Sequence, residues 1–126
     1  PYYQKAIKGY VRRDRRYAAE IFAEYFKAYR APLDDPTLQL NLAKALITAG
    51  HYDIADRALE SLIVSKRGTP SILEEAYILR ARVLEERLGL TEAALHVYDE
   101  FLQRFPQSSR AEFARNKCRR AGIEVM

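Results

Sequence analysis

The sequence predicts an all-α fold, a row of helical hairpins stacked side by side. Apolar residues recur at three- and four-residue steps in successive segments, which is the spacing of one helix face. The five glycines and five prolines lie almost entirely between these segments, and no run alternates apolar and polar side chains as a strand does. With 126 residues, the chain is long enough for one domain with a buried core. We expect that domain to cover residues 1–126.

The first predicted hairpin, residues 1–33, pairs a helix over 2–12 with a helix over 17–29. The second of these helices carries the clearer signal, because large apolar and aromatic residues repeat along one stripe. Its expected inward residues are Ala18, Phe22, Tyr25, Phe26 and Tyr29.

The second predicted hairpin, residues 34–69, has well-defined boundaries. Asp35-Pro36 combines an N-cap residue with a proline at the first helical position, and Gly50 fits the left-handed position that follows a helix. A second helix begins within two residues of Gly50, and so short a connection makes the two helices antiparallel. The expected inward residues are Leu38, Leu42, Ala45, Leu46 and Ala49, then Tyr52, Ala55, Ala58, Leu59, Leu62 and Ile63.

The third predicted hairpin covers residues 70–106. Ser71 and Glu74 are spaced as a capping box, in which each side chain satisfies a free amide of the first turn. Thr91 is expected to cap the second helix, and Pro106 to stop it. The expected inward residues are Tyr77, Ala81 and Leu84, then Ala94, Tyr98, Phe101, Leu102 and Phe105.

A capping helix over 109–121 is expected to close the row. It opens with a second capping box, formed by Ser109 and Glu112. Small residues share one stripe of this helix: Ala111, Ala114, Cys118 and Ala121.

The three second helices align as a repeat. The segments 18–30, 55–67 and 94–106 each begin with alanine and place a large apolar residue four positions later. Those large residues are 37 and 39 residues apart, at Phe22, Leu59 and Tyr98. Periods of about 20–50 residues indicate stacked units, each of which relies on a neighbour to cover its apolar face.

The segment "NLAKALITAGHYDIADRAL", residues 41–59, begins with the packing pair Leu42 and Ala43. At fixed spacing there follow Leu46, Gly50, Tyr52, Ala55, Leu59 and Leu62. This pattern resembles the tetratricopeptide repeat, and the third unit is similar at Ala81, Leu84, Gly89, Ala94, Tyr98, Phe101 and Pro106, with one extra residue before Gly89. The spacing exceeds the family's usual length of about 34 residues, and the first two units lack the closing proline. The resemblance implies an α-α superhelix, a solenoid of three helix-turn-helix units plus a C-terminal capping helix.

No residues in the sequence form a recognisable catalytic constellation. We interpret His51-Tyr52-Asp53 as a hairpin corner, because metal binding needs at least three converging ligands and the other histidine, His96, lies in the next unit. Cys118 has no histidine near it in sequence to generate a thiolate. Phosphate loops and nucleophile motifs are also missing. We therefore expect a protein that is not an enzyme and that carries no metal and no cofactor.

Positive charge is concentrated at the two ends of the sequence. Residues 1–17 carry a net charge of +5 and residues 110–120 carry +4, whereas residues 18–109 carry −4. We call the arginines of the first end the basic tip: Arg12, Arg13, Arg15 and Arg16. The charges are either solvated helix faces or a contact with anionic phospholipid headgroups or an acidic protein neighbour. No aromatic residues interleave the basic tract, which argues against a nucleic-acid partner.

The resemblance also implies a binding groove, because the first helix of each tetratricopeptide unit lines a concave surface. Carried over to this chain, the groove residues are Thr37, Leu40, Asn41, Lys44, Ile47 and Thr48 in the second unit, and Glu75, Ile78, Leu79, Arg82 and Glu85 in the third. Leu40, Ile47 and Ile78 lie off the expected core stripes. They either form an apolar groove for a peptide or helix or pack on neighbouring helices.

Some tetratricopeptide proteins use a carboxylate clamp to hold the acidic tail of a partner. Asn41 matches one clamp position, but Glu75 and Leu79 stand where the clamp requires basic residues. A glutamate that faces a C-terminal carboxylate disfavours its binding, so we expect no clamp here.

These observations predict a non-catalytic protein–protein interaction module that binds a partner peptide or helix in the concave groove. The alternative is a structural or regulatory tail of a membrane-anchored parent, with the basic N-terminal end near anionic lipid. Self-association through the ends of the solenoid, giving a homo-oligomer, is a third hypothesis, and two like-charged tips oppose it.

The setting of the protein is predicted from three features. The chain begins at Pro1, and residues 98–114 are similar to units of bacterial envelope proteins, so we expect a fragment of a larger bacterial protein. A single cysteine suits a reducing compartment, which favours the cytoplasm over the periplasm or envelope. No apolar run is long enough to span a bilayer.

Overall fold

The computed structural model describes residues 2–122, and within that range it is all-helical, with no strand. Residues 1 and 123–126 of the predicted domain lie outside the described residues. The all-α class is therefore confirmed. The elements are α1 (Tyr2–Tyr10), α2 (Arg15–Tyr29), α3 (Pro36–Thr48), α4 (Tyr52–Ser65), α5 (Pro70–Arg82), the π-helix η1 (Val83–Arg87), α6 (Thr91–Arg104) and α7 (Ala111–Arg120).

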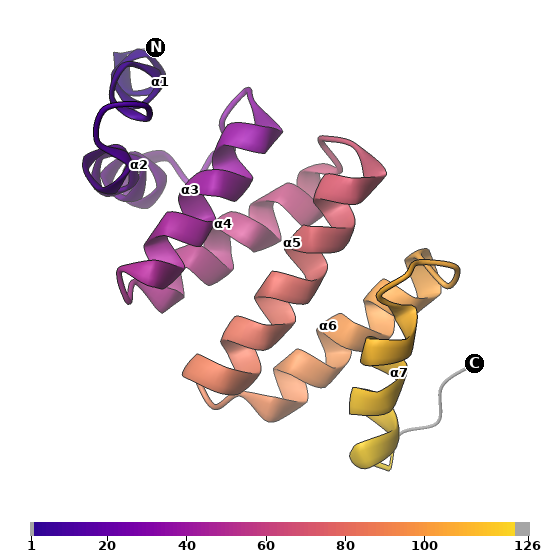
Figure 1. Ribbon diagram of the computed structural model, residues 1–126. Coiled ribbons are helices and arrows are strands. Elements are labelled where there is room, and N and C mark those ends of the chain that lie inside the picture. The colour runs from indigo at the N-terminus through magenta and orange to yellow at the C-terminus, as the bar shows by residue number, and fades with distance from the viewer. Residues whose placement is uncertain (1, 123–126) are drawn as a thin grey trace.

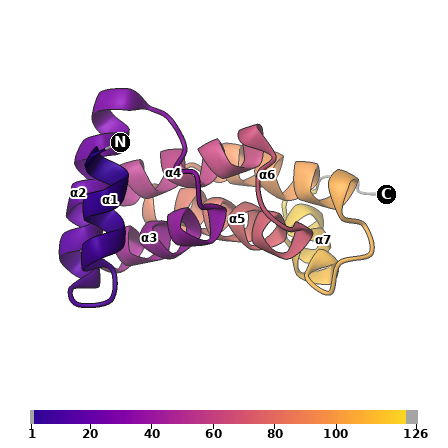
Figure 2. The same ribbon diagram turned by 90° about the horizontal axis from the view of Figure 1, so that it is seen from above.

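Consecutive helices pack on one another, and α1 and α7 lie at opposite ends of the resulting row (Figure 1). Helices two places apart also touch, α2 with α4 and α3 with α5. Viewed from above, α3 and α5 lie in one layer, and α4 and α6 lie in the other (Figure 2). The described chain is thus an open array of helical pairs, the general arrangement of an α-solenoid. We call the side formed by α3 and α5 the first-helix side, and the side formed by α4 and α6 the second-helix side.

The boundaries of α3 are those that the sequence predicts. The Asp35 carboxylate accepts a hydrogen bond from the Leu38 amide at 3.2 Å, and Pro36 takes the first helical position, where its missing N–H costs nothing. Gly50 has a φ of +85°, a left-handed conformation that glycine adopts without a Cβ penalty. The chain therefore reverses at once, and α4 begins at Tyr52.

The predicted start of α5 is wrong by two residues. Its N-cap is Thr69, whose hydroxyl accepts a hydrogen bond from the Ile72 amide at 3.3 Å. Pro70 then occupies the first turn, so this helix repeats the cap-then-proline pattern of Asp35-Pro36. Glu74, which was expected to complete a capping box with Ser71, instead accepts a hydrogen bond from the Ser108 hydroxyl. That contact ties α5 to the loop before α7.

The starts of α6 and α7 also differ from the prediction. Thr91 is the first residue of α6 and not its N-cap, and no side chain caps that helix. α7 begins at Ala111, so Ser109 and Glu112 form no capping box. The Glu112 carboxylate lies within 3.4 Å of the Arg115 guanidinium and 3.3 Å of that of Arg119. These ion pairs use the carboxylate that the capping box would need.

α5 continues directly into the π-helix η1. The Leu88 amide donates to the Val83 carbonyl at 3.0 Å, one residue further back than in an α-helix. A π-turn accommodates one additional residue in a helix, which accounts for the extra residue before Gly89 in the third unit. Val83 and Leu84 stay buried, so the insertion leaves the packing of the helix intact.

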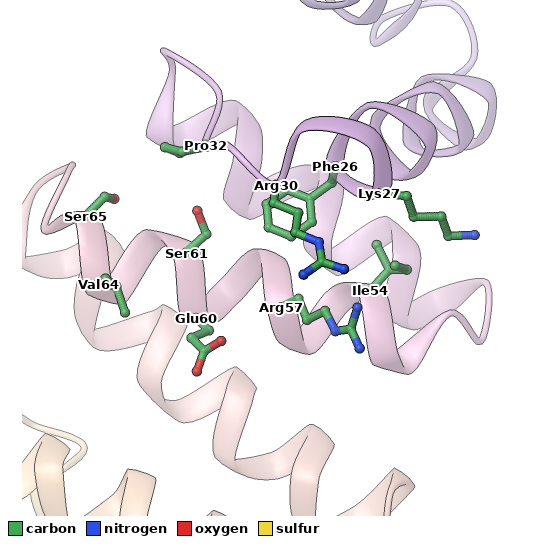
Figure 3. A pocket seen from close by; sticks show the side chains of 10 residues that line it. All are labelled: Phe26, Lys27, Arg30, Pro32, Ile54, Arg57, Glu60, Ser61, Val64 and Ser65. Carbon is green, nitrogen blue, oxygen red and sulfur yellow. The ribbon is translucent and has the colours of Figure 1, made fainter.

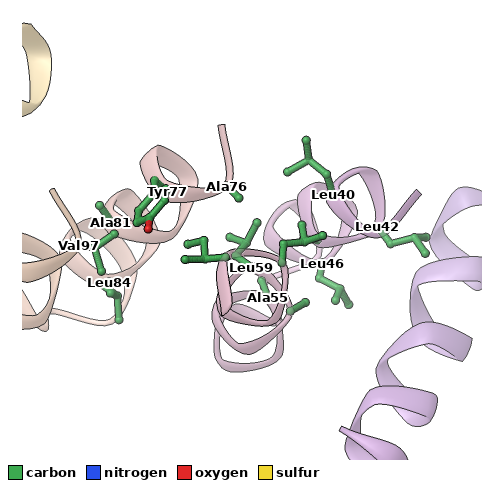
Figure 4. Close-up of a cluster of buried hydrophobic side chains, with 14 of the residues drawn as sticks. Leu40, Leu42, Leu46, Ala55, Leu59, Ala76, Tyr77, Ala81, Leu84 and Val97 are labelled. Carbon is green, nitrogen blue, oxygen red and sulfur yellow. The ribbon is translucent and has the colours of Figure 1, made fainter. Parts of the chain in front are cut away.

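One apolar core runs through the whole row, from Ile7 in α1 to Cys118 in α7. Figure 4 shows part of it, with apolar side chains of α3, α4, α5 and α6 gathered between the helices. Fully burying a large apolar side chain contributes about 1.5–3 kcal/mol. The predicted repeat anchors Phe22, Leu59 and Tyr98 are all 0% exposed.

Three residues that were expected to point inward are exposed: Tyr29, Ala49 and Ala121. Tyr29 is the last residue of α2 and is 61% exposed. Ala49 and Ala121 are the C-caps of α3 and α7. Their positions on the stripe were predicted correctly, but a helix end extends past the neighbour that would cover it.

Gln39 is a polar residue of α3 that is 0% exposed. Its carbonyl oxygen accepts a hydrogen bond from the Leu33 amide at 2.6 Å, and its amide nitrogen donates to the Ala58 carbonyl at 2.9 Å. Gln39 therefore fixes the linker that follows α2 against α4. The sequence analysis assigned no role to this residue.

Ion pairs also join successive units. Arg80 of α5 binds two carboxylates of α4, that of Asp56 at 2.8 Å and that of Glu60 at 3.1 Å. Burial raises the pKa of Asp56, while its hydrogen bond with Arg80 acts in the opposite direction. Lys117 of α7 binds Glu85 of η1 at 2.8 Å. These contacts add directional links to the apolar packing.

Candidate functional site

The basic tip lies at the turn between α1 and α2. All four of its arginines are exposed. Asp14 caps α2 by accepting a hydrogen bond from the Tyr17 amide at 3.0 Å, which places Arg15 and Arg16 in the first turn of that helix. The Arg13 guanidinium lies over the Tyr10 ring, 5.1 Å from its centroid.

Positive charge at the tip is largely uncompensated. Arg12, Arg15 and Arg16 form no ion pair among residues 2–122. The first turn of α2 contains no acidic residue, although the partial positive charge of a helix N-terminus favours one there. The only carboxylate in the turn belongs to the N-cap Asp14. This end of the molecule is therefore suited to an anionic ligand.

The tip and α3 together form a cleft. It consists of two adjoining hollows of about 750 Å³ and 570 Å³, both lined by Arg15 and Asn41. Arg12 and Thr37 line the first hollow, together with Val11, Asp35 and Leu38. The second is also lined by Arg16, Lys44, Ala45, Thr48 and Ala49. We call this feature the tip cleft. The tip cleft contains residues of two surfaces that were predicted separately from the sequence, the basic tip and the groove of the second unit.

The polar groove residues of α3 line the wall of the tip cleft. These residues are Thr37, Asn41, Lys44 and Thr48. The Thr48 hydroxyl donates to the Lys44 carbonyl at 3.2 Å, so it is engaged with its own helix. Asn41 is half-buried, and its side chain makes no hydrogen bond with another residue in the range 2–122. Its amide remains able to donate to a ligand oxygen and to accept from a ligand N–H.

Of the apolar residues assigned to the predicted groove, the structure buries Leu40 and leaves the other three partly exposed. Leu40 is only 4% exposed and belongs to the core. Ile47, Ile78 and Leu79 are half-buried and pack against the same core. Leu40 and Ile47 lie off the main stripe of α3, but α3 is covered by α2, α4 and α5, so a wider arc of its surface is buried than one stripe suggests.

The charged groove residues are paired within the protein. Lys44 of α3 forms an ion pair with Glu75 of α5, and Lys117 neutralises Glu85. Arg82 pairs with Glu86 at 3.2 Å. On the first-helix side, the charged groove residues of α5 are therefore paired within the chain, whereas the arginines of the adjoining basic tip are not.

The remaining residues that the sequence singled out, His51, Tyr52 and Cys118, lie at helix ends or in the core. His51 is the exposed N-cap of α4, and the Arg87 guanidinium lies over the ring of Tyr52 at 5.6 Å. Cys118 is 0% exposed, and burial, with a smaller effect of Asp99, raises the pKa of its thiol. Within residues 2–122, no three His, Cys, Asp or Glu side chains are grouped as metal ligands.

A further hollow, which the sequence analysis missed, lies between α2 and α4 on the second-helix side (Figure 3). The sequence held one signal for it. Val64 lies off the apolar stripe of its helix, the same criterion that singled out Leu40. Val64 of α4 is 72% exposed, whereas Leu40 of α3 is 4% exposed. An apolar residue off the main stripe of its helix therefore lies on the surface in α4 and in the core in α3.

Comparisons with known proteins identify no relative of this chain. No family model matches it, and searches of curated proteins and of solved structures give no significant match. In the part of the chain that the structure describes, none of the helices is both long and apolar enough to cross a bilayer.

Proposed function

We propose that this chain is a non-catalytic protein–protein interaction module, built as a tetratricopeptide-like solenoid, and that it binds an acidic segment of a partner protein in the tip cleft. The observation that carries the proposal is the set of unpaired guanidinium groups of Arg12, Arg15 and Arg16 in a cleft whose other wall is α3. Arginine recognises carboxylates through two parallel hydrogen bonds, so these groups favour an acidic peptide.

The proposal departs from the groove predicted from the sequence in two ways. Leu40 is buried, so the peptide contacts polar residues of α3 and not an apolar strip. The ion pair between Lys44 and Glu75 limits the acidic segment to the N-terminal end of the first-helix side. Beyond it, the charges of Glu75 and Glu85 are paired within the chain and offer the segment no free cation.

Fluorescence anisotropy with a labelled peptide of alternating glutamate and serine tests the proposal. We expect the double variant Arg12→Gln/Arg15→Gln to bind at least tenfold more weakly than the wild type. The matched control is Lys66→Gln/Arg120→Gln, which removes the same charge from exposed residues outside the tip cleft. Equal losses in the two variants would mean that only net charge matters, and the tip cleft would then be no binding site.

A second candidate function is a contact between the basic tip and an anionic membrane surface. All four tip arginines are exposed at one end of the row, and each basic residue near an anionic surface contributes about 1 kcal/mol. Sedimentation with phosphatidylserine vesicles separates the two functions. Vesicle binding would depend on Arg13 as much as on Arg15 and would not change in Asn41→Ala, whereas peptide binding would weaken in Asn41→Ala.

A further inference from the structure

The hollow between α2 and α4, which we call the second-helix cleft, has a volume of about 630 Å³. Its apolar lining includes Phe26 of α2, and Ile54 and Val64 of α4. Val64 is 72% exposed although it is β-branched and apolar. A partner's apolar side chains that cover this surface would remove it from water, which favours binding.

Three cations surround this apolar lining: Lys27, Arg30 and Arg57. All three are exposed, and none forms an ion pair with another residue between 2 and 122. Figure 3 shows the guanidinium groups of Arg30 and Arg57 extending into the same part of the cleft from the two walls. The one carboxylate in the lining, that of Glu60, is bound by Arg80 at 3.1 Å. The cleft therefore has a net positive charge that the chain itself does not compensate.

The position of Arg30 is fixed by its backbone. Arg30 follows the last residue of α2 with a φ of +51°, and its amide donates to the Phe26 carbonyl at 2.9 Å. This left-handed cap holds the α-carbon at the rim of the cleft. Arg57 lies in the middle of α4, so both guanidinium groups extend from ordered backbone.

The dimensions of the cleft indicate the size of its ligand. On α4 the lining includes Ile54, Arg57, Ser61 and Val64, whose spacing of three, four and three residues forms a single stripe of the helix. At 1.5 Å per residue, this stripe is about 15 Å long. It matches about three turns of a helix that lies between α2 and α4.

We propose that the second-helix cleft binds a short amphipathic acidic helix of a partner protein. The apolar side chains of that helix cover Ile54, Val64 and the edge of Phe26, and its carboxylates pair with Arg30 and Arg57. A neutral or basic helix would cover the same apolar surface but would leave these guanidinium groups desolvated without a counter-charge. The site is separate from the tip cleft, with which it shares no lining residue.

The test is an NMR titration of the isotope-labelled chain with a capped 14-residue peptide. The peptide carries leucine at helical spacing on one face and glutamate elsewhere, and a control peptide has glutamine in place of each glutamate. We expect amide shifts confined to residues 26–32 and 54–65, and binding at least tenfold weaker for the glutamine peptide. Arg30→Gln/Arg57→Gln and Val64→Gln should each weaken binding of the acidic peptide at least tenfold.

The controls use exposed residues, so every variant is expected to fold, and its amide spectrum shows whether it does. Lys8→Gln/Arg120→Gln removes two charges from exposed residues outside the cleft lining and should leave binding unchanged. The proposal is overturned if the acidic peptide causes no shifts at millimolar concentration, or if the shifts fall at residues 12–16 and 37–48. It is also overturned if the cleft amides shift with the concentration of the chain alone, since the occupant would then be a second copy.

Discussion

Replacing Gln39 with leucine tests whether one buried polar side chain joins the first two units. Leucine has nearly the same volume as glutamine but removes both of its hydrogen bonds, the 2.6 Å bond from the Leu33 amide and the 2.9 Å bond to the Ala58 carbonyl. The Ala58 carbonyl lies within α4 and keeps its helical partner. The main cost is the Leu33 amide, which is left buried without an acceptor.

An unsatisfied buried donor costs about 1–3 kcal/mol, so we expect Gln39→Leu to lower the free energy of unfolding by that amount. For a domain of this size, this corresponds to a decrease in Tm of about 3–12 °C. Urea unfolding followed by circular dichroism measures the free energy, and hydrogen exchange of the Leu33 amide should accelerate more than that of core amides. The matched control is Gln103→Leu, because Gln103 is exposed and bonds only to Asp99. Its effect should stay within about 0.5 kcal/mol.

The reasoning is refuted if Gln39→Leu is as stable as the wild type or more stable. That result would mean that the Leu33 amide finds another partner, or that the linker moves to expose it. The hydrogen exchange rate distinguishes these two cases, since only an exposed amide exchanges rapidly.

Three further predictions concern buried or paired groups. The Tyr98 hydroxyl is buried and has no hydrogen-bond partner among residues 2–122, so Tyr98→Phe should raise stability by up to about 1 kcal/mol in urea unfolding; a clear loss would contradict this. Burial also raises the pKa of Tyr98 above its ordinary value of 10.0. The unfolded state therefore loses this proton first, and stability should fall above about pH 10 more steeply in the wild type than in Tyr98→Phe. Cys118 is buried and the pKa of its thiol is raised. A thiol reagent should therefore react with Cys118 only as fast as the protein unfolds. Rapid labelling of the folded protein would refute the burial of this thiol. Arg80→Gln should cost about 1–3 kcal/mol at pH 7 by leaving the partly buried Asp56 without its partner. Burial raises the pKa of Asp56, and the loss should shrink as the pH falls through that raised pKa, because the protonated carboxyl no longer needs a cation; a loss independent of pH would assign the effect to packing.

The helices and their inward faces could be predicted from the sequence because local chemistry determines them. Asp35-Pro36 and Gly50 define one helix without reference to any other part of the chain. The anchors Phe22 and Leu59 are fully buried, since a stripe at helical spacing indicates which face a neighbour covers. The predicted start of α5 was two residues late because Thr69 caps the helix in place of Ser71, and that of α7 was one residue early because Arg110 is its N-cap and no side chain caps it.

Burial that depends on several neighbours could not be predicted. Leu40 lies off the main stripe of α3 and is nevertheless buried, because three other helices pack around α3. Gln39 is polar, and its partners lie 6 and 19 residues away in the sequence. Nothing in the local pattern indicates that this glutamine lies in the core.

The two sets of residues that form the candidate site were predicted from the sequence, but their position in a single cleft was not. The basic tip and the polar residues of α3 were both identified from the sequence, yet their convergence depends on how the first pair packs on the second. The pairing of Lys44 with Glu75, which limits the site to one end, is likewise a contact between units. The second-helix cleft could not be predicted either, because its lining combines residues of α2 and α4 that only the packing of the two helices brings together.

The most direct test of the proposed site is a double-mutant cycle between its two walls. Arg15 and Asn41 line both hollows of the tip cleft, and calorimetry of the acidic peptide would be repeated with Arg15→Gln, Asn41→Ala and the double variant. If one ligand contacts both walls, each substitution weakens binding and the two effects are coupled by at least about 0.5 kcal/mol. Additive effects within about 0.3 kcal/mol, or an Asn41→Ala variant that binds as the wild type does, would contradict a shared site and leave the arginines as a simple charged surface.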